Sequence, residues 1–178
     1  MIVAEFCSLF FAKMGLFLSV YIFELRIILE NSKELQFDWA ISIALFYNTI
    51  STIFLILSIY IRYDIWLQWS ITIEKYTIYD TIYNTGIWKN MLVEIVVNIL
   101  APTPFFDGWK YTEKVEAFDT EVQYEVNDIL LFLSFARLYK LVEFILYQTE
   151  FMNPRAQRVC SLNGCEAGPM FALKSLMQ

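Results

Sequence analysis

The longest stretch of the chain without a charged residue is 39–61, WAISIALFYNTISTIFLILSIYI. It holds 23 residues, between Asp38 and Arg62. As an α-helix it would be about 34 Å long, enough to cross the hydrocarbon core of a bilayer, which is about 30 Å thick. The stretch therefore predicts a membrane-spanning helix and an integral membrane protein.

The composition of the 178 residues agrees with this prediction. Hydrophobic residues make up 58% and charged residues 18%, whereas soluble domains carry about 25% charged residues. The net charge of −6 argues against nucleic-acid binding, which needs a basic surface. Histidine is absent, and no nucleophile or phosphate-binding motif occurs. We therefore expect no enzyme activity, cofactor or metal site.

Three further segments have the apolar pattern of membrane helices. Residues 2–23 are apolar except for Glu5 and Lys13, which we expect to reach the membrane surface from a helix end. Residues 91–106 form a third, weaker span that ends in prolines. Residues 126–151 carry several charges, but their apolar residues recur at helical spacing. Such a helix requires its charges to face protein or water.

The fold class expected is therefore an all-α membrane protein with a four-helix transmembrane bundle over residues 1–151. Residues 63–84, rich in Trp and Tyr, extend the second helix and return along the membrane interface. Residues 152–178 form a cytoplasmic linker. It ends in a short amphipathic helix, residues 170–177, for which Pro169 provides the first position.

The basic residues of the loops predict the orientation. The loop after the second helix and the C-terminal tail hold six Lys and Arg, and the two opposite loops hold four. The first set is Arg62, Lys75, Lys89, Arg155, Arg158 and Lys174, and the second is Arg26, Lys33, Lys110 and Lys114. Because cytoplasmic loops carry the excess of basic residues, we expect a multi-pass protein with both termini in the cytoplasm.

Ionisable residues at membrane depth are the candidate functional residues, since each is costly there. Arg137 and Lys140 are three positions apart and share a helix face, as the charges of a voltage sensor do. Glu143 interrupts this series, so voltage dependence should be shallow. Glu94 and Asp128 are the expected counter-charges. An alternative is that Glu94 pairs with Arg137 or Lys140 only to hold two helices in register.

Five short runs of the sequence occur in the order found in a known channel family. They are residues 51–53 (STI), 92–104 (LVEIVVNILAPTP), 126–133 (VNDILLFL), 136–139 (ARLY) and 171–177 (FALKSLM). Together they resemble the first four helices, and the linker to the fifth, of small-conductance calcium-activated potassium channels. The sequence departs from the family at Lys140, which replaces an apolar residue, and at Glu143, which replaces a second arginine. Ala101 replaces a histidine, and the linker at 158–163 is one residue shorter.

The resemblance implies the voltage-sensor-like domain of a calcium-activated potassium channel subunit that is poorly sensitive to voltage. In that family calmodulin carries the calcium signal, and the subunits form a homotetramer through the pore. The chain has no potassium-filter sequence, so we expect the pore outside these residues. We expect the plasma membrane rather than an organelle. The linker residues implied in coupling are Arg158, Leu162, Phe171 and Leu176.

Two alternatives remain open at the sequence level. The chain could be a poreless, channel-derived structural subunit of a larger membrane complex, such as an organellar one. The short helix of the linker could equally lie on the membrane interface without a protein partner. A proton-conducting voltage sensor is disfavoured because the basic series is short.

Overall fold

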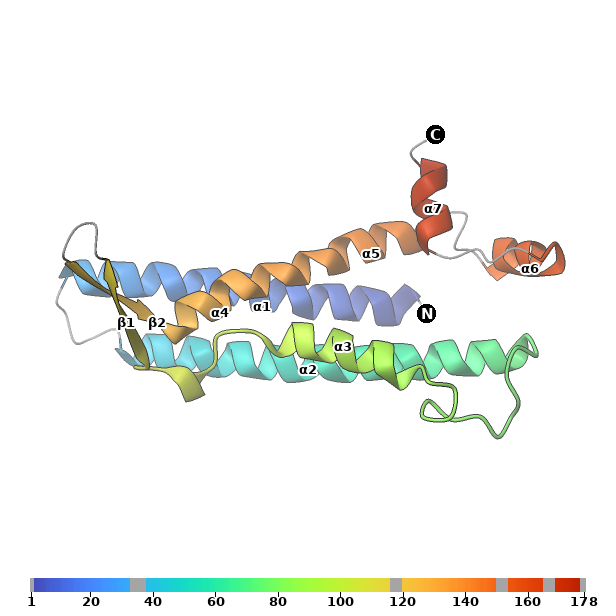
Figure 1. The fold of residues 1–178 in the computed structure, drawn as a ribbon, viewed down its shortest axis with the longest axis horizontal. Helices are drawn as coiled ribbons and strands as arrows, with labels where there is room; N and C mark the ends of the chain where they lie inside the picture. The colour runs from blue at the N-terminus through green and yellow to red at the C-terminus, as the bar shows by residue number, and fades with distance from the viewer. Residues whose placement is uncertain (1, 33–37, 116–119, 150–153, 165–168, 177–178) are drawn as a thin grey trace.

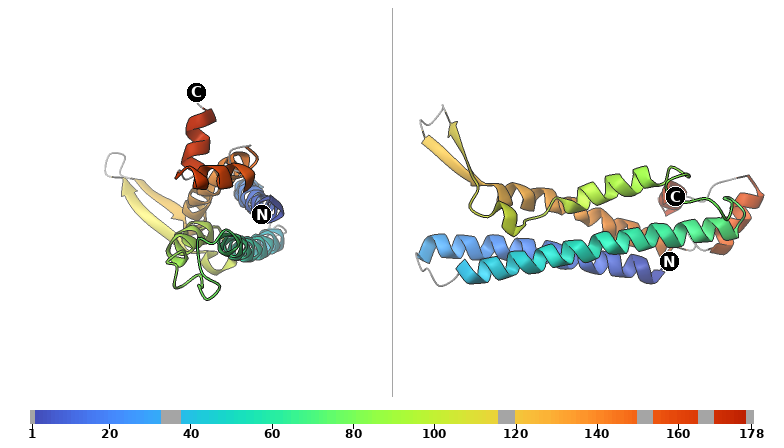
Figure 2. Two further views of the ribbon diagram at one scale, coloured as in Figure 1. Left: turned by 90° about the vertical axis from the view of Figure 1, so that its right-hand side faces the viewer. Right: turned by 90° about the horizontal axis from the view of Figure 1, so that it is seen from below.

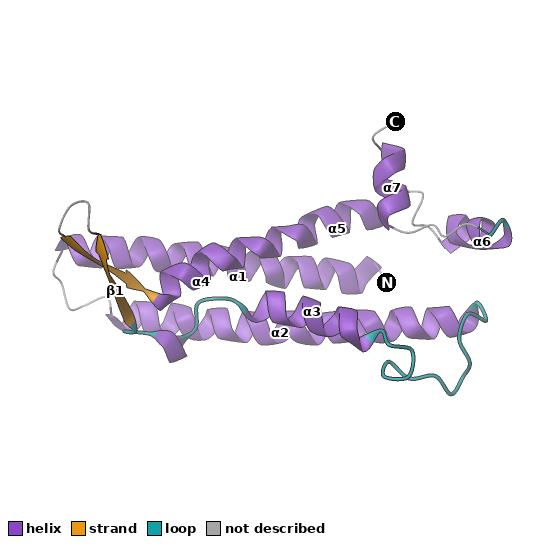
Figure 3. Cartoon of the chain, in the orientation of Figure 1, coloured by secondary structure: helices purple, strands orange, loops and turns teal. Residues whose placement is uncertain are grey.

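The computed structural model describes residues 2–32, 38–115, 120–149, 154–164 and 169–176. This part of the chain is mostly helical (Figures 1 and 3). The elements in chain order are α1 (Ile2–Ser32), α2 (Asp38–Thr72), α3 (Trp88–Ile99), η2 (Pro104–Phe106), β1 (Lys110–Val115), β2 (Thr120–Glu125), α4 (Val126–Ser134), η3 (Phe135–Leu138), α5 (Tyr139–Tyr147), α6 (Pro154–Leu162) and α7 (Pro169–Leu176).

The helices α1 and α2 form a long antiparallel pair (Figure 1). Within the described residues, two stretches are long and apolar enough to cross a membrane, Val3–Ile28 and Trp39–Thr72. The span predicted at 39–61 therefore lies in one helix, which continues to Thr72 as expected. Ile22, Leu25 and Leu45 are among the buried apolar residues that join the two helices.

The distribution of side chains differs from that of a typical soluble protein. Large apolar side chains lie outside, such as Phe17, which is 68% exposed, and Trp39, which is 67% exposed. Buried positions include polar and charged side chains such as Asn48, Arg137 and Lys140. In water this arrangement would be unfavourable, because exposed apolar area costs free energy. It is the arrangement expected where the surrounding solvent is lipid.

Two shorter helical segments cover one side of the α1–α2 pair (Figure 2). One is α3. The other is the continuous run of α4, η3 and α5 over residues 126–147, which we call the fourth helical segment. At about 33 Å it is long enough for a bilayer, although it ends at Tyr147 rather than at residue 151.

The third span predicted at 91–106 is shorter in the structure. Helix α3 has 12 residues and ends at Ile99, which makes it about 18 Å long. The reason is the pair Pro102 and Pro104, since proline cannot donate to the helix and restricts the residue before it. The structure thus shows two long helices and two other helical segments, and does not confirm four transmembrane helices.

The all-α prediction is wrong for residues 110–125, which include two antiparallel strands. Tyr111 pairs with Tyr124, and Lys110 pairs with Glu125 at the base of the hairpin. In β2, β-branched and aromatic residues alternate with Glu and Gln, a period-two pattern that suits a strand. The hairpin stands at the end of the molecule where α1 ends and α2 begins (Figure 1).

The linker contains two helices in its described part. Helix α7 begins at Pro169 and ends at Leu176, close to the predicted 170–177. Helix α6 was not predicted, and it also begins with a proline, Pro154, at a position that suits this residue. Helix α7 contacts α5, with Ala172 fully buried.

Candidate functional site

Five charged side chains from four helices meet near the start of α1. They are Glu5 of α1, Arg62 of α2, Glu94 of α3, and Lys140 and Glu143 of α5, and we call them the charge cluster. The side chains of Glu5 and Lys140 are 2% and 1% exposed. Glu143, the most accessible of the five, is 24% exposed. The cluster is therefore largely removed from solvent.

Arg62 and Lys140 are both shared between carboxylates. Arg62 donates from Nη1 to Glu143 and, at 3.5 Å, to Glu5 Oε1, and from Nη2 to Glu94. Lys140 Nζ donates to Glu94 Oε1 and, at 3.0 Å, to Glu143 Oε2. These ion pairs tie together all four helices. When all five groups are ionised, two cations face three carboxylates and the cluster carries one negative charge in excess.

A hydrogen-bonded chain extends from the cluster toward the middle of the molecule. Tyr139 donates its hydroxyl to Glu94 Oε1 at 3.0 Å, and Asn98 Nδ2 donates to the Tyr139 oxygen at 2.8 Å. Asn98 is fully buried. Such a chain fixes the ring and the carboxylate relative to one another, since each group satisfies its neighbour.

Arg137 lies in a different environment, one without a carboxylate among the described residues. It is 2% exposed, and its Nη2 donates to Thr52 Oγ1 at 3.0 Å and to the Asn98 carbonyl at 2.7 Å. Its Nε and Nη1 have no hydrogen-bond partner within the described part of the chain. A Cβ atom on Gly15 would clash with Nη1. The absence of a side chain at Gly15 therefore provides space for the guanidinium.

The local backbone explains how the fourth helical segment presents these charges. Arg137 lies in the 3₁₀ turn η3, directly before α5. A 3₁₀ helix has three residues per turn, so Arg137 and Lys140 project in nearly the same direction. The spacing identified in the sequence thus places both side chains toward α1, α2 and α3.

Asp128, the second predicted counter-charge, lies at the opposite end of the fourth helical segment. Its carboxylate is 3.8 Å from Arg26 of α1. Arg26 also pairs with Glu125 and, at 2.6 Å, with Asp107. Arg26 therefore ties the base of the hairpin to α1, through the segment before β1 and the end of β2.

The structure brings together Glu94 and Lys140, but it places Arg137 apart from the acids. The expectation that Glu5 reaches the membrane surface is wrong, because this side chain is buried against Arg62. In the sequence, Arg62 marked the end of a span and was counted among the basic residues of the loop that follows. Its position one residue after the longest apolar run could have indicated a buried ion pair, since a basic side chain there can point into the helix bundle.

The predicted linker residues lie on α6 and α7. Arg158 and Leu162 belong to α6, and Leu162 is 86% exposed. Phe171 belongs to α7 and is 46% exposed. Leu176 ends α7, and its side chain lies outside the described residues.

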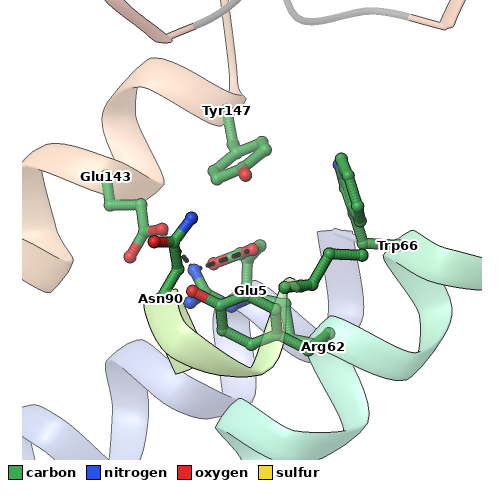
Figure 4. Close-up of a pocket in the computed structure, with 8 residues that line it drawn as sticks. Glu5, Arg62, Trp66, Asn90, Glu143 and Tyr147 are labelled. Carbon is green, nitrogen blue, oxygen red and sulfur yellow. Dashed lines mark hydrogen bonds and ion pairs between the residues drawn. The ribbon is translucent and has the colours of Figure 1, made fainter. Parts of the chain in front are cut away.

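A cavity of about 210 Å³ adjoins the charge cluster (Figure 4). Its walls come from α1, α2, α5, the start of α3 and the residue before α3. The lining residues are Glu5, Arg62, Tyr63, Trp66, Ile87, Asn90, Glu143 and Tyr147. Within the described residues, no group of three or more His, Cys, Asp or Glu side chains is arranged to hold a metal ion.

No family model, curated protein or solved structure matches the chain.

Proposed function

We propose that the chain is the voltage-sensor-like domain of a cation-channel subunit whose fourth helical segment is locked by ion pairs. In this proposal the domain belongs to a calcium-activated potassium channel and has little sensitivity to voltage. It passes a cytoplasmic calcium and calmodulin signal through the linker to a pore outside these 178 residues. The observation that carries the proposal is the arrangement of Arg137 and Lys140 on the fourth helical segment, buried against α2 and α3.

The ion pairs of Lys140 support the claim of weak voltage sensitivity. Glu143 lies on the same helix, so any movement of Lys140 carries the opposite charge with it. Arg137, Lys140 and Glu143 together then move a single net charge, worth about 2.3 kcal/mol per 100 mV. Breaking the contact of Lys140 with Glu94 would cost about 3–5 kcal/mol. Voltage alone is therefore too weak to release the segment.

The contact between α7 and α5 supports a route for a signal from the linker. Ala172 of α7 is fully buried, and α5, which α7 contacts, carries Lys140 and Glu143. A pull on α7 would therefore act on the helix that holds the charge cluster. Calcium and calmodulin enter the proposal through the sequence resemblance.

Charge reversal at Glu94 tests whether the cluster is a lock or a sensor. In the native assembly, Glu94→Lys would face Arg62 and Lys140 with like charge, so we expect loss of assembly at the membrane. The matched control is Glu24→Lys, an exposed position on α1, which should assemble normally. A normally assembled Glu94→Lys channel whose voltage midpoint moves by on the order of tens of millivolts would contradict the proposal.

The mass of the native polypeptide separates this proposal from a poreless structural subunit. The 178 residues have a mass of 21.1 kDa. A native mass well above this value, with a pore and filter in the additional sequence, is the expected result. A native mass of 21.1 kDa would refute the channel proposal and favour a structural subunit.

A further inference from the structure

The cavity beside the charge cluster combines an excess negative charge with aromatic walls. Its charged lining consists of the Glu5 and Glu143 carboxylates and the Arg62 guanidinium. With all three groups ionised, the lining carries one negative charge in excess, as does the cluster as a whole. A buried excess charge is costly unless an opposite charge is close.

Glu5 is the carboxylate with the weakest partner. It is 2% exposed, and among the described side chains its carboxylate accepts one hydrogen bond, from Arg62 at 3.5 Å. This distance is beyond the usual range for a charge-assisted hydrogen bond. Glu5 therefore has capacity for a further donor, and the cavity lies directly against it (Figure 4).

The aromatic walls suit a cation with an apolar body. Tyr63, Trp66 and Tyr147 line the cavity, and aromatic faces attract cations at about 6 Å or less from the ring. The Arg62 guanidinium already lies 5.0 Å from the centre of the Tyr63 ring. The Arg62 side chain thus shows that a guanidinium can lie between an aromatic ring and carboxylates at this wall of the cavity.

The volume and access of the cavity allow a small molecule. At about 210 Å³, it greatly exceeds the roughly 10–15 Å³ that a single water molecule needs. Asn90, which is exposed, lies in its lining. A ligand can therefore reach the cavity from the surface.

We propose that this cavity binds a small monovalent organic cation, with an ammonium or guanidinium group that donates to Glu5, near the charge of Glu143, and an apolar body against Trp66. A metal ion is disfavoured because the Glu143 and Glu94 carboxylates are already engaged by Arg62 and Lys140. The proposal does not depend on the proposed channel function, since it uses only the cavity and its lining.

Benzylammonium is a suitable probe, with benzyl alcohol as a neutral molecule of similar shape. The full chain is titrated in lipid nanodiscs while the indole N–H signal of Trp66 is followed by NMR, with Trp66→Phe to assign the signal. We expect saturable binding of benzylammonium with a dissociation constant of about 1 mM or lower. Benzyl alcohol should bind at least roughly tenfold more weakly. Equal binding of the two probes, or no saturable shift with benzylammonium, would overturn the proposal.

Glu5→Gln keeps the shape of the side chain and removes its charge, so it should weaken benzylammonium binding by roughly tenfold. Glu24→Gln, on an exposed position of the same helix, should change the affinity by less than about twofold. If Glu5→Gln does not fold, the more accessible Glu143→Gln provides the same comparison. Unchanged affinity in the folded variant would show that the cation does not bind at these carboxylates.

Discussion

Arg137 and Lys140 are both basic and lie one turn apart, but their side chains have different kinds of hydrogen-bond acceptors. Lys140 is balanced by two carboxylates, whereas the hydrogen bonds of Arg137 are to the neutral oxygens of Thr52 and Asn98. Removing Lys140 therefore leaves buried acids with less compensation. Removing Arg137 leaves two neutral oxygens without a donor, and an unpaired neutral acceptor costs less free energy than an unpaired carboxylate.

The first prediction compares these two residues by the free energy of unfolding in detergent micelles. We expect Lys140→Gln to destabilise the protein by about 3–5 kcal/mol and Arg137→Gln by about 1–2 kcal/mol. Lys89→Gln, at an exposed position, should stay within about 0.5 kcal/mol of the unmodified chain. An equal or larger loss for Arg137→Gln would show that Arg137 has a stronger partner than the structure indicates.

The second prediction concerns the space that Gly15 leaves for Arg137. Alanine normally stabilises a helix relative to glycine by about 1 kcal/mol. At Gly15, however, the new Cβ would clash with Arg137 Nη1. Because the guanidinium is held by hydrogen bonds to Thr52 and Asn98 that would have to shift, we expect Gly15→Ala to destabilise by about 1–3 kcal/mol. In an Arg137→Gln background the same change should be neutral or stabilising. Destabilisation of the same size in both backgrounds would rule out the steric conflict with Arg137.

At the scale of elements, one residue of α1 forms ion pairs on both sides of the base of the β-hairpin. Arg26 pairs with Asp107 before β1 and with Glu125 at the end of β2. An isolated two-stranded hairpin is only marginally stable. The contacts of Arg26 therefore decide whether the hairpin keeps its place.

The third prediction follows from this dependence and uses amide hydrogen exchange. In Arg26→Gln, the amides of β1 and β2 should exchange roughly tenfold faster, while those of α2 remain protected. Lys13→Gln, an exposed position on the same helix, is the control and should leave exchange in the strands unchanged. Unaltered protection of the hairpin in Arg26→Gln would mean that the strands are stable without this anchor.

The sequence predicted the elements that depend on one local feature, such as a long uncharged run or a proline at the start of a helix. The uncharged run at 39–61 predicted α2, and Pro169 predicted the start of α7. The hairpin was missed because its residues were read as a polar loop between two spans, and only the second strand has a period-two pattern. The prolines were identified as the end of the third span, but the apolar run led to a predicted bound at residue 106, past the end of α3 at Ile99.

The candidate site was predictable only in part, for a geometric reason. Spacing places Arg137 and Lys140 on one face, because both lie on the same helix. The partners Glu5, Arg62 and Glu94 come from three other helices, and their register relative to the fourth segment is a tertiary property. Sequence position therefore suggested that Glu94 was a partner, but it did not distinguish Lys140 from Arg137.

At the scale of the whole molecule, the loop between α2 and α3 and the β-hairpin lie at opposite ends of α2 (Figure 1). Tyr79 in this loop is 90% exposed, and Tyr111 in the hairpin is 61% exposed. If the long helices cross a membrane, these two positions face opposite compartments.

The fourth prediction tests this topology with a membrane-impermeant maleimide on intact cells. Tyr79→Cys and Tyr111→Cys are introduced separately into a chain whose three native cysteines are replaced by serine. From the positive-inside rule, we expect Tyr111→Cys to react from outside and Tyr79→Cys only after permeabilisation. Labelling of both from the same side would contradict a transmembrane α1–α2 pair.

The most direct test of the central claim is the current through the native assembly in a lipid bilayer, recorded over a range of voltages while calcium is varied on the side of the termini. If the charge cluster locks the fourth helical segment, potassium current should require calcium. Its voltage dependence should then correspond to about one elementary charge per chain or less. A current that opens steeply with voltage in the absence of calcium would show that the segment moves in the field, and would contradict the account.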